Sequence, residues 1–260
     1  MKIATWNVNS LRVRLPQLEQ WLASAKPDVL CLQETKVRDS DFPVAAFSAN
    51  GYDVVFHGQP SYNGVAIAAR GALTDVMVGL EGFPDEQCRT LSASYRGVRV
   101  ASLYVPNGTA LDSPRYPYKL EWLRALRAQS ARWLSCYPAL VLAGDFNIAP
   151  EDKDVYDPEA WQGSVLVSEP ERAAFREITA GGFTDALRVI GGEDCGFSWW
   201  DYRAGAFRRD QGLRIDHILL SAPLAHVCER CYVDRNARGH VRPSDHAPVV
   251  AEIAWPSAGA

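Results

Sequence analysis

The segment formed by residues 140–147 constrains the fold of this chain more than any other. It begins with apolar residues that continue into Gly144, which predicts a short buried strand. A carboxylate and a carboxamide follow two residues apart, as Asp145 and Asn147. Because side chains alternate along an extended backbone, both would project from the same side of the strand end, where they could orient a water molecule against a polar substrate. An Asx turn, in which both side chains bond nearby backbone groups, explains the same two residues equally well.

Similar short apolar segments recur along the chain. They predict strands at residues 2–8, 29–33, 52–56, 65–69, 90–95, 99–105, 213–220, 226–233 and 249–253. Apolar residues at helical spacing predict helices that begin after a cap at Ser10 and at residues 117–135, 169–180 and 185–190. No Ser/Gly linker or repeat divides the chain. We therefore expect one α/β domain over residues 1–255, with two packed, mostly antiparallel or mixed sheets, helices outside, and a short frayed tail at residues 256–260.

The composition is that of an ordinary soluble protein. The chain has 260 residues, 47% of them hydrophobic, and a formal net charge of −4. This charge does not indicate a nucleic-acid partner, although the distribution of charge matters more than its sum. The amino terminus lacks the apolar core of a signal peptide, and no run of about 18 apolar residues could span a bilayer. We expect a cytoplasmic protein without a membrane partner.

Polar residues follow the predicted strands at six places. They are Asn7, Glu34, Tyr104 with Asn107, Asp145 with Asn147, Asp216, and Asp245 with His246. Any one of them could be a solvated side chain, but strand ends on a rigid scaffold are where sites are built. Carboxylate and amide oxygens suit Mg²⁺ or Mn²⁺, and no cysteine or second histidine among these residues favours zinc. One histidine and one tyrosine add groups that can contact or protonate phosphate oxygens.

These residues lie in motifs that resemble those of a known family. The motifs are Trp6-Asn7-Val8-Asn9, Leu32-Gln33-Glu34-Thr35-Lys36, Tyr104-Val105-Pro106-Asn107-Gly108, Gly144-Asp145-Phe146-Asn147, Gly212-Leu213-Arg214-Ile215-Asp216 and Ser244-Asp245-His246. In this order they resemble the exonuclease III family, the Mg²⁺-dependent apurinic/apyrimidinic endonucleases of base excision repair. The resemblance extends from residue 2 to about residue 253 and implies a four-layer α/β sandwich with the site at one mouth of the two sheets.

The resemblance also implies a role for each polar residue at the metal. Glu34 would be the chief metal ligand, with Asn7 beside it. Asp145 would orient or deprotonate the attacking water with support from Asn147, and both are expected as further metal ligands. Asp245 would bind the metal directly or through water.

The remaining roles concern the phosphate. By the same resemblance, His246 would contact the scissile phosphate and would be held by Asp216, which fixes the tautomer of the ring. Tyr104 and Asn107 would bind the phosphate on its other side.

A further group of residues is expected to bind substrate. In the resembled family the motifs that contain Trp199, Leu213 and Ile215 line a small apolar pocket for the base-less sugar, although all three residues could equally belong to the core. Two adjacent tryptophans on a strand point to opposite faces, so only one of Trp199 and Trp200 can face the core. Among basic residues near the motifs, Lys119 and Arg203 are expected to contact DNA.

The sequence therefore predicts a Mg²⁺-dependent nuclease. It would hydrolyse the phosphodiester 5′ to an abasic site in duplex DNA, leave a 3′ hydroxyl, and act at 3′ ends as an exonuclease and as a phosphatase or phosphodiesterase. Its partner would be double-stranded DNA with abasic sites or 3′ ends, and the protein would be a monomer. The alternatives are a superfamily phosphatase or phosphodiesterase acting on a non-DNA phosphate ester and a non-catalytic DNA-binding module.

Overall fold

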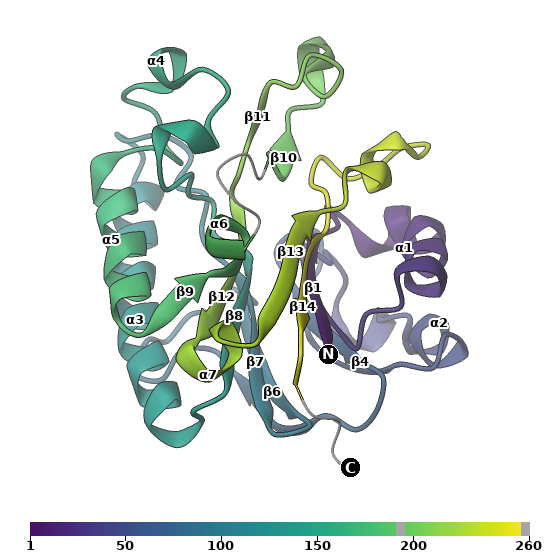
Figure 1. Cartoon of the computed structure of the whole chain (residues 1–260). Coiled ribbons are helices and arrows are strands. Elements are labelled where there is room, and N and C mark those ends of the chain that lie inside the picture. Colours follow the sequence, from purple (N-terminus) through teal and green to yellow (C-terminus); the bar gives the residue numbers. More distant parts are fainter. Residues whose placement is uncertain (191–195, 256–260) are drawn as a thin grey trace.

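The computed structural model describes residues 1–190 and 196–255, so the predicted tail at residues 256–260 lies outside the described part. Two six-stranded sheets pack face to face, and a two-stranded ribbon stands at one edge of the pair (Figure 1). Helices α3 (Arg115–Cys136) and α5 (Glu169–Ala180) cover one side, and α1 (Leu11–Ala25) and α2 (Val44–Ala49) cover the other. The predicted four-layer α/β sandwich is confirmed.

The first sheet has the strand order β13-β14-β1-β2-β4-β3. Its strands are β13 (Cys228–Val233), β14 (Val249–Ile253), β1 (Lys2–Asn7), β2 (Val29–Gln33), β4 (Val65–Ala69) and β3 (Asp53–His57). The second sheet has the order β5-β6-β7-β8-β12-β9. Its strands are β5 (Thr74–Val78), β6 (Thr90–Tyr95), β7 (Val98–Tyr104), β8 (Leu140–Asp145), β12 (Asp216–Ser221) and β9 (Phe183–Asp185). The ribbon pairs β10 (Trp199–Trp200) with β11 (Gly212–Leu213).

The remaining helices are short. They are α4 (Pro158–Trp161), α6 (Ala186–Ile190) and α7 (Ala222–Ala225), with 3₁₀ turns η1 (Asp39–Asp41), η2 (Asp152–Asp154), η3 (Arg203–Gly205) and η4 (Arg235–Gly239). Within residues 1–190 and 196–255, no helix combines the length and the apolar character that crossing a bilayer requires.

One parallel pair in each sheet determines where the strand ends lie. β1 and β2 are parallel, as are β7 and β8, while the other pairings in the two six-stranded sheets are antiparallel. Parallel neighbours need a long crossover, and α1 and α3 provide it. The carboxyl ends of β1 and β2 therefore meet at one edge of the first sheet, and those of β7 and β8 meet at one edge of the second.

Alternation along the strands builds the core. Val141 of β8 faces the first sheet, and its neighbour Leu142 faces α3 and α5, where it packs with Leu126 and Phe175. Every residue of β8 is buried because both faces of the strand are covered. An uninterrupted apolar strand in the sequence therefore reflects a central position in the sandwich.

Several local predictions were wrong. β5 was missed because all its residues are exposed at a sheet edge, and β9 because it has only three residues. The strand predicted at residues 213–220 is broken at Arg214 and Ile215, where the backbone passes from β11 in the ribbon to β12 in the second sheet. Ser10 precedes α1 with a φ of 93°, and its side chain makes no capping hydrogen bond.

Gly144 lies where β7 and β8 approach each other closely. A Cβ at this position would lie 1.9 Å from the carbonyl oxygen of Leu103, which is backbone and cannot move aside without distorting the sheet. We expect Gly144→Ala to lower the free energy of unfolding by about 2–3 kcal/mol, as overpacking does in other cores. Urea denaturation measures this change. Gly239→Ala is the control, because its Cβ would enter open space; equal stabilities of the two variants would contradict the prediction.

Candidate active site

The register of the sheets brings the polar strand ends together at one mouth of the sandwich. In the second sheet, Asp145 at the end of β8 is directly opposite both Tyr104 at the end of β7 and Asp216 at the start of β12. In the first sheet, Asn7 at the end of β1 is opposite Gln33, the last residue of β2, and Glu34 follows. Strand pairing therefore sets the positions of Asn7, Tyr104, Asp145 and Asp216 independently of their polar contacts.

Two carboxylates from opposite sheets meet at this mouth. The carboxamide of Asn7 donates one hydrogen bond to Glu34 Oε1 (2.9 Å) and another to Asp145 Oδ2 (2.9 Å). The oxygen of the same carboxamide accepts the backbone N–H of Asn9 (2.9 Å). Lys36 neutralises part of the charge, since its ammonium lies 2.8 Å from Glu34 Oε2. The motif Gln33-Glu34-Thr35-Lys36 thus supplies both a carboxylate and its counter-ion.

The arrangement fits a hard divalent cation. Ligand atoms of Glu34, Asp145 and His246 all lie within 4.8 Å of one another. Carboxylate oxygens are the donors that Mg²⁺ and Mn²⁺ prefer. Asp245, which is expected to bind the metal directly or through water, accepts hydrogen bonds from Asn9 Nδ2 (3.0 Å) and from the indole N–H of Trp199 (3.1 Å).

His246 and Asp216 form a buried pair beside these carboxylates. Nδ1 of His246 lies 2.8 Å from Asp216 Oδ2, and Nε2 lies 3.8 Å from Asp145 Oδ2. Burial lowers the pKa of His246, but the charges of Asp216 and Asp145 outweigh it, so the net effect raises the pKa and favours the imidazolium. For Asp145 the effect of burial is the reverse: burial is the main cause that raises its pKa, and the charge of His246 opposes this increase.

Ser198 fixes this pair and was not identified from the sequence. Its hydroxyl donates to Asp216 Oδ2 (2.7 Å) and accepts the backbone N–H groups of Ile215 (3.1 Å) and Asp216 (3.0 Å). Ser244 acts similarly on the other side, with its hydroxyl donating to the backbone oxygen of Asn7 (2.7 Å). Both serines lie within recognised motifs, but only the fold shows which backbone groups they reach.

Tyr104 and two carboxamides line the side of the site opposite His246. Burial raises the pKa of Tyr104 well above its ordinary value, helped by the charges of Glu34 and Asp145, so the phenol keeps its proton. The guanidinium of Arg89, another residue missed from the sequence, lies 4.6 Å from the ring centre and donates to the backbone oxygen of Tyr104 (3.2 Å).

The carboxamides of Asn107 and Asn147 are hydrogen-bonded to each other, and that of Asn147 also bonds the carboxylate of Asp145. Asn107 Nδ2 donates to Asn147 Oδ1 (2.9 Å), and Asn147 Nδ2 donates to Asp145 Oδ2 (3.1 Å). A cavity of about 450 Å³ opens beside Tyr104 and Asn107, with Arg89 and Arg115 among its lining residues. The two residues that are expected to bind phosphate therefore adjoin a cavity that two arginines help to line.

The predicted sugar-pocket residues gather in one small cluster. Leu213 and Ile215 are buried, and partly exposed Trp199 packs against them together with Trp161, whose ring centre lies 6.4 Å away at 88°. Trp200 turns to the opposite side and is buried, as the alternation along a strand predicts. Of the three predicted pocket residues, Trp199 is the one that is partly exposed to solvent.

The two basic residues expected to contact DNA differ in position. Arg203 is exposed at the start of η3. Lys119 is completely buried, and its ammonium pairs with Glu171 and with backbone carbonyls, so its expected direct contact with DNA does not fit this position. The sequence places Lys119 near the motifs but does not show that Glu171 of α5 and the loops with Asn107 and Asn147 enclose its ammonium.

Comparison with known proteins is consistent with this site. Residues 4–246 match the endonuclease/exonuclease/phosphatase family. The chain is 33% identical to exodeoxyribonuclease III of Haemophilus influenzae, over 97% of this chain and 100% of that protein.

Two solved structures are similar over nearly the whole chain. One is a 3′ phosphatase from Neisseria bound to a product DNA hairpin (47% identity, TM-score 0.96), and the other is an AP endonuclease from Archaeoglobus fulgidus (42% identity, TM-score 0.95). Each match covers 98% of this chain and 100% of the other. The chain therefore belongs to the endonuclease/exonuclease/phosphatase family, which confirms the resemblance inferred from its motifs.

Proposed function

We propose that this protein is a Mg²⁺-dependent DNA repair nuclease that hydrolyses the phosphodiester 5′ to an abasic site and leaves a 3′ hydroxyl. The observation that carries the proposal is the convergence of Glu34, Asp145 and His246 from separate strand ends at one mouth of the sandwich. The names of the similar proteins support DNA as the substrate and support companion activities at 3′ ends, as an exonuclease and as a phosphatase.

Glu34 and Asp145 would hold the metal, for which Mn²⁺ could substitute. When bound, the ion neutralises charge on the phosphoryl oxygens. Asn7 and Asn147 lie against the two carboxylates and would contribute a carboxamide oxygen, and Asp245, which is bonded to Asn9 and Trp199, would bind the ion directly or through water.

The chain's own residues would divide the remaining work. Asp145 is placed to accept the proton of an attacking water, and the imidazolium of His246 would donate to a phosphate oxygen while Asp216 holds the ring. On the other side, Tyr104 and Asn107 would donate to the same phosphate. Each such group typically contributes about 10²–10⁴-fold to a rate, so no single residue carries the whole reaction.

Selectivity for the abasic site would come from the cluster at the ribbon. Trp199 packs against Leu213 and Ile215 and would form a wall that admits a compact sugar but excludes an attached base. Arg203, Arg208 and Arg209 are exposed, follow Trp199 in the chain and would hold the phosphates of the duplex. That the protein acts as a monomer in the cytoplasm stays a prediction from the sequence.

Removing the carboxylate of Glu34 tests the metal assignment. We expect Glu34→Ala to lower the rate of abasic-site incision in Mg²⁺ by at least about 10²-fold, because electrostatic stabilisation of the transition state is lost. A gel assay on a duplex with one abasic site measures this rate. Glu121→Ala, an exposed carboxylate on α3, should leave it unchanged.

The same assay tests the substrate class. The unmodified protein should nick the abasic duplex and should not release phosphate from inositol phosphates. Turnover of inositol phosphates alone would replace the nuclease proposal with a phosphatase, and binding of DNA without turnover of either substrate would indicate a non-catalytic module.

Asp216→Asn tests the charge on His246. Asp216 is the strongest influence that raises the pKa of His246, so its loss should lower that pKa. The imidazolium exists below its pKa, so the variant should lose activity first on the alkaline side, and the alkaline limb of the kcat profile should move to lower pH. A pH–rate profile measures this shift. A uniform decrease at every pH would show instead that Asp216 only orients the ring.

Trp199→Ala tests the selectivity wall. Opening the pocket should reduce abasic-site incision while sparing or raising attack at intact nucleotides, because exclusion of the base is lost. The ratio of the two rates on matched duplexes measures the effect, and Trp199→Phe, which keeps a ring but loses the hydrogen bond to Asp245, separates shape from bonding. Equal loss of both activities in a folded Trp199→Ala variant would contradict the assignment.

A further inference from the structure

Lys119 occupies an unusual position beneath the candidate active site. It lies near the start of α3, and its side chain is completely buried. Its ammonium donates to the backbone oxygens of Asn147 (2.6 Å) and Asn107 (3.2 Å) and pairs with the carboxylate of Glu171. A lysine ammonium has three N–H donors, and these three acceptors use all of them. No donor remains for a DNA phosphate.

The two carbonyls belong to residues whose side chains form part of the site. Asn107 follows β7 and Asn147 follows β8, and their carboxamides are hydrogen-bonded to each other (2.9 Å). Asn147 also bonds Asp145 through its side chain and through its backbone N–H (2.9 Å), and it has a left-handed φ of 50°. A residue other than glycine keeps this conformation only where its surroundings hold it. The ammonium of Lys119 is one of the groups that do so.

The partner of Lys119 is itself held firmly. Glu171 lies in the first turn of α5, where its carboxylate accepts the backbone N–H groups of Leu166 (3.0 Å) and Ser168 (3.1 Å). Gly108 completes the arrangement, since a Cβ there would lie 3.3 Å from Cδ of Lys119 and crowd its stem. The charge pair thus connects α3, the start of α5 and the two loops that carry the carboxamides.

We propose that Lys119 is a positioning residue for phosphodiester hydrolysis, which fixes the Asn107–Asn147 carboxamide pair against Asp145 through two backbone carbonyls without touching DNA. This role rests on the proposed function and replaces the direct DNA contact expected from the sequence. A lysine suits this positioning role, because its ammonium can donate to two backbone carbonyls and a carboxylate at once.

The variant must keep the fold. Lys119→Met alone would leave Glu171 buried without its counter-ion, which is strongly destabilising. The test therefore also uses Lys119→Met with Glu171→Gln, which removes the uncompensated buried charge. The glutamine oxygen keeps the hydrogen bonds from Ser168, while the bond from the Leu166 N–H, which reaches the other carboxylate oxygen, is lost. Both variants should lower kcat on abasic duplex on the order of 10–100-fold, as a small misplacement of reacting groups does, with KM changed less than about threefold.

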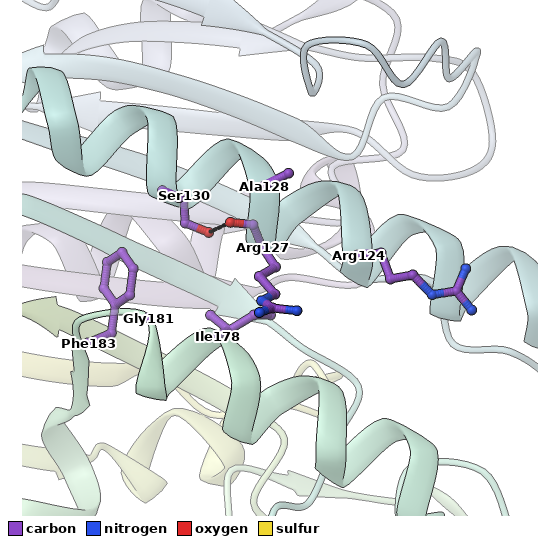
Figure 2. Close-up of a pocket in the computed structure, with 8 residues that line it drawn as sticks. Arg124, Arg127, Ala128, Ser130, Ile178, Gly181 and Phe183 are labelled. Carbon is purple, nitrogen blue, oxygen red and sulfur yellow. Dashed lines mark hydrogen bonds between the residues drawn. The ribbon is translucent and has the colours of Figure 1, made fainter.

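Two further variants control for stability and for charge. Leu126→Ala removes a buried apolar side chain of α3 that makes no hydrogen bond to the site, so it should destabilise the protein and leave kcat unchanged below its unfolding temperature. Arg127→Met removes another ion pair between α3 and α5, with Glu177 (2.9 Å), where the two helices form an exposed groove (Figure 2). It should leave kcat unchanged as well.

Salt dependence of binding distinguishes positioning from a phosphate contact. Affinity for the abasic duplex is measured in EDTA, so that no cleavage occurs, over a range of salt concentrations. Lys119→Met/Glu171→Gln should keep the slope of log affinity against log salt, whereas loss of a direct phosphate contact would reduce the slope by about one. A reduced slope, or an unchanged kcat in the folded variant, overturns the proposal.

A readout independent of cleavage completes the test. In ¹⁵N–¹H spectra of the free protein, the side-chain amide signals of Asn107 and Asn147 should shift in the Lys119 variants and stay in place in Leu126→Ala and Arg127→Met. Unshifted signals in the Lys119 variants overturn the positioning role. If the unmodified protein does not cleave DNA, the proposed function fails, while these signals still decide whether Lys119 holds the carboxamides.

Discussion

The repulsion between carboxylates gathered at the mouth of the two sheets is the constraint on which the rest of the site depends. Glu34, Asp145, Asp216 and Asp245 lie in one region, and among the described side chains Lys36 and His246 are the cations paired with them. Burial raises the pKa of Asp145, and the charges of Asp216 and Glu34 add to this effect while that of His246 opposes it. Asn7 relieves part of the repulsion by donating to two carboxylates, and a divalent cation would relieve the remainder. The repulsion between these carboxylates in the free protein would therefore favour binding of a cation.

The backbone around these groups is also held away from its preferred conformations. Asn9, Glu34, Lys36 and Asn147 have positive φ values between 42° and 54°, which are uncommon for residues other than glycine. Such residues persist where surrounding contacts determine them, and here each follows a strand end that must turn its side chain into the mouth. The sandwich supplies those contacts through strand pairing and packing. The packing that stabilises the sheets thus also holds the polar groups in fixed positions.

Much of the site was predictable because it depends on local rules. Asp145 and Asn147 were recognisable from period-two alternation after an apolar strand, and the position of that strand in the sandwich follows from burial of both its faces. What the sequence did not show depends on long-range placement. The role of Ser198 requires the ribbon to lie beside β12, and the burial of Lys119 requires α5 to cover the start of α3. Neither contact has a local signal.

Under the proposed function, the ribbon would couple recognition of the sugar to the chemistry at the phosphate. Backbone hydrogen bonds join Trp200 N–H to the oxygen of Asp245 (3.0 Å) and Ala247 N–H to the oxygen of Ser198 (2.8 Å), so the segments on either side of Trp199 and His246 are paired. The indole of Trp199 bonds Asp245, and Ser198 bonds Asp216, the partner of His246. Under the proposed function, a sugar that seats against Trp199 would be positioned by the same short ribbon that fixes the imidazole. A nucleotide whose base prevents that seating would leave its phosphate displaced from His246, and a displacement of about 1 Å is enough to reduce a rate on the order of 10²-fold. Exclusion of the base at the pocket would then become selectivity in the chemical step, because one ribbon is bonded to the groups that serve both.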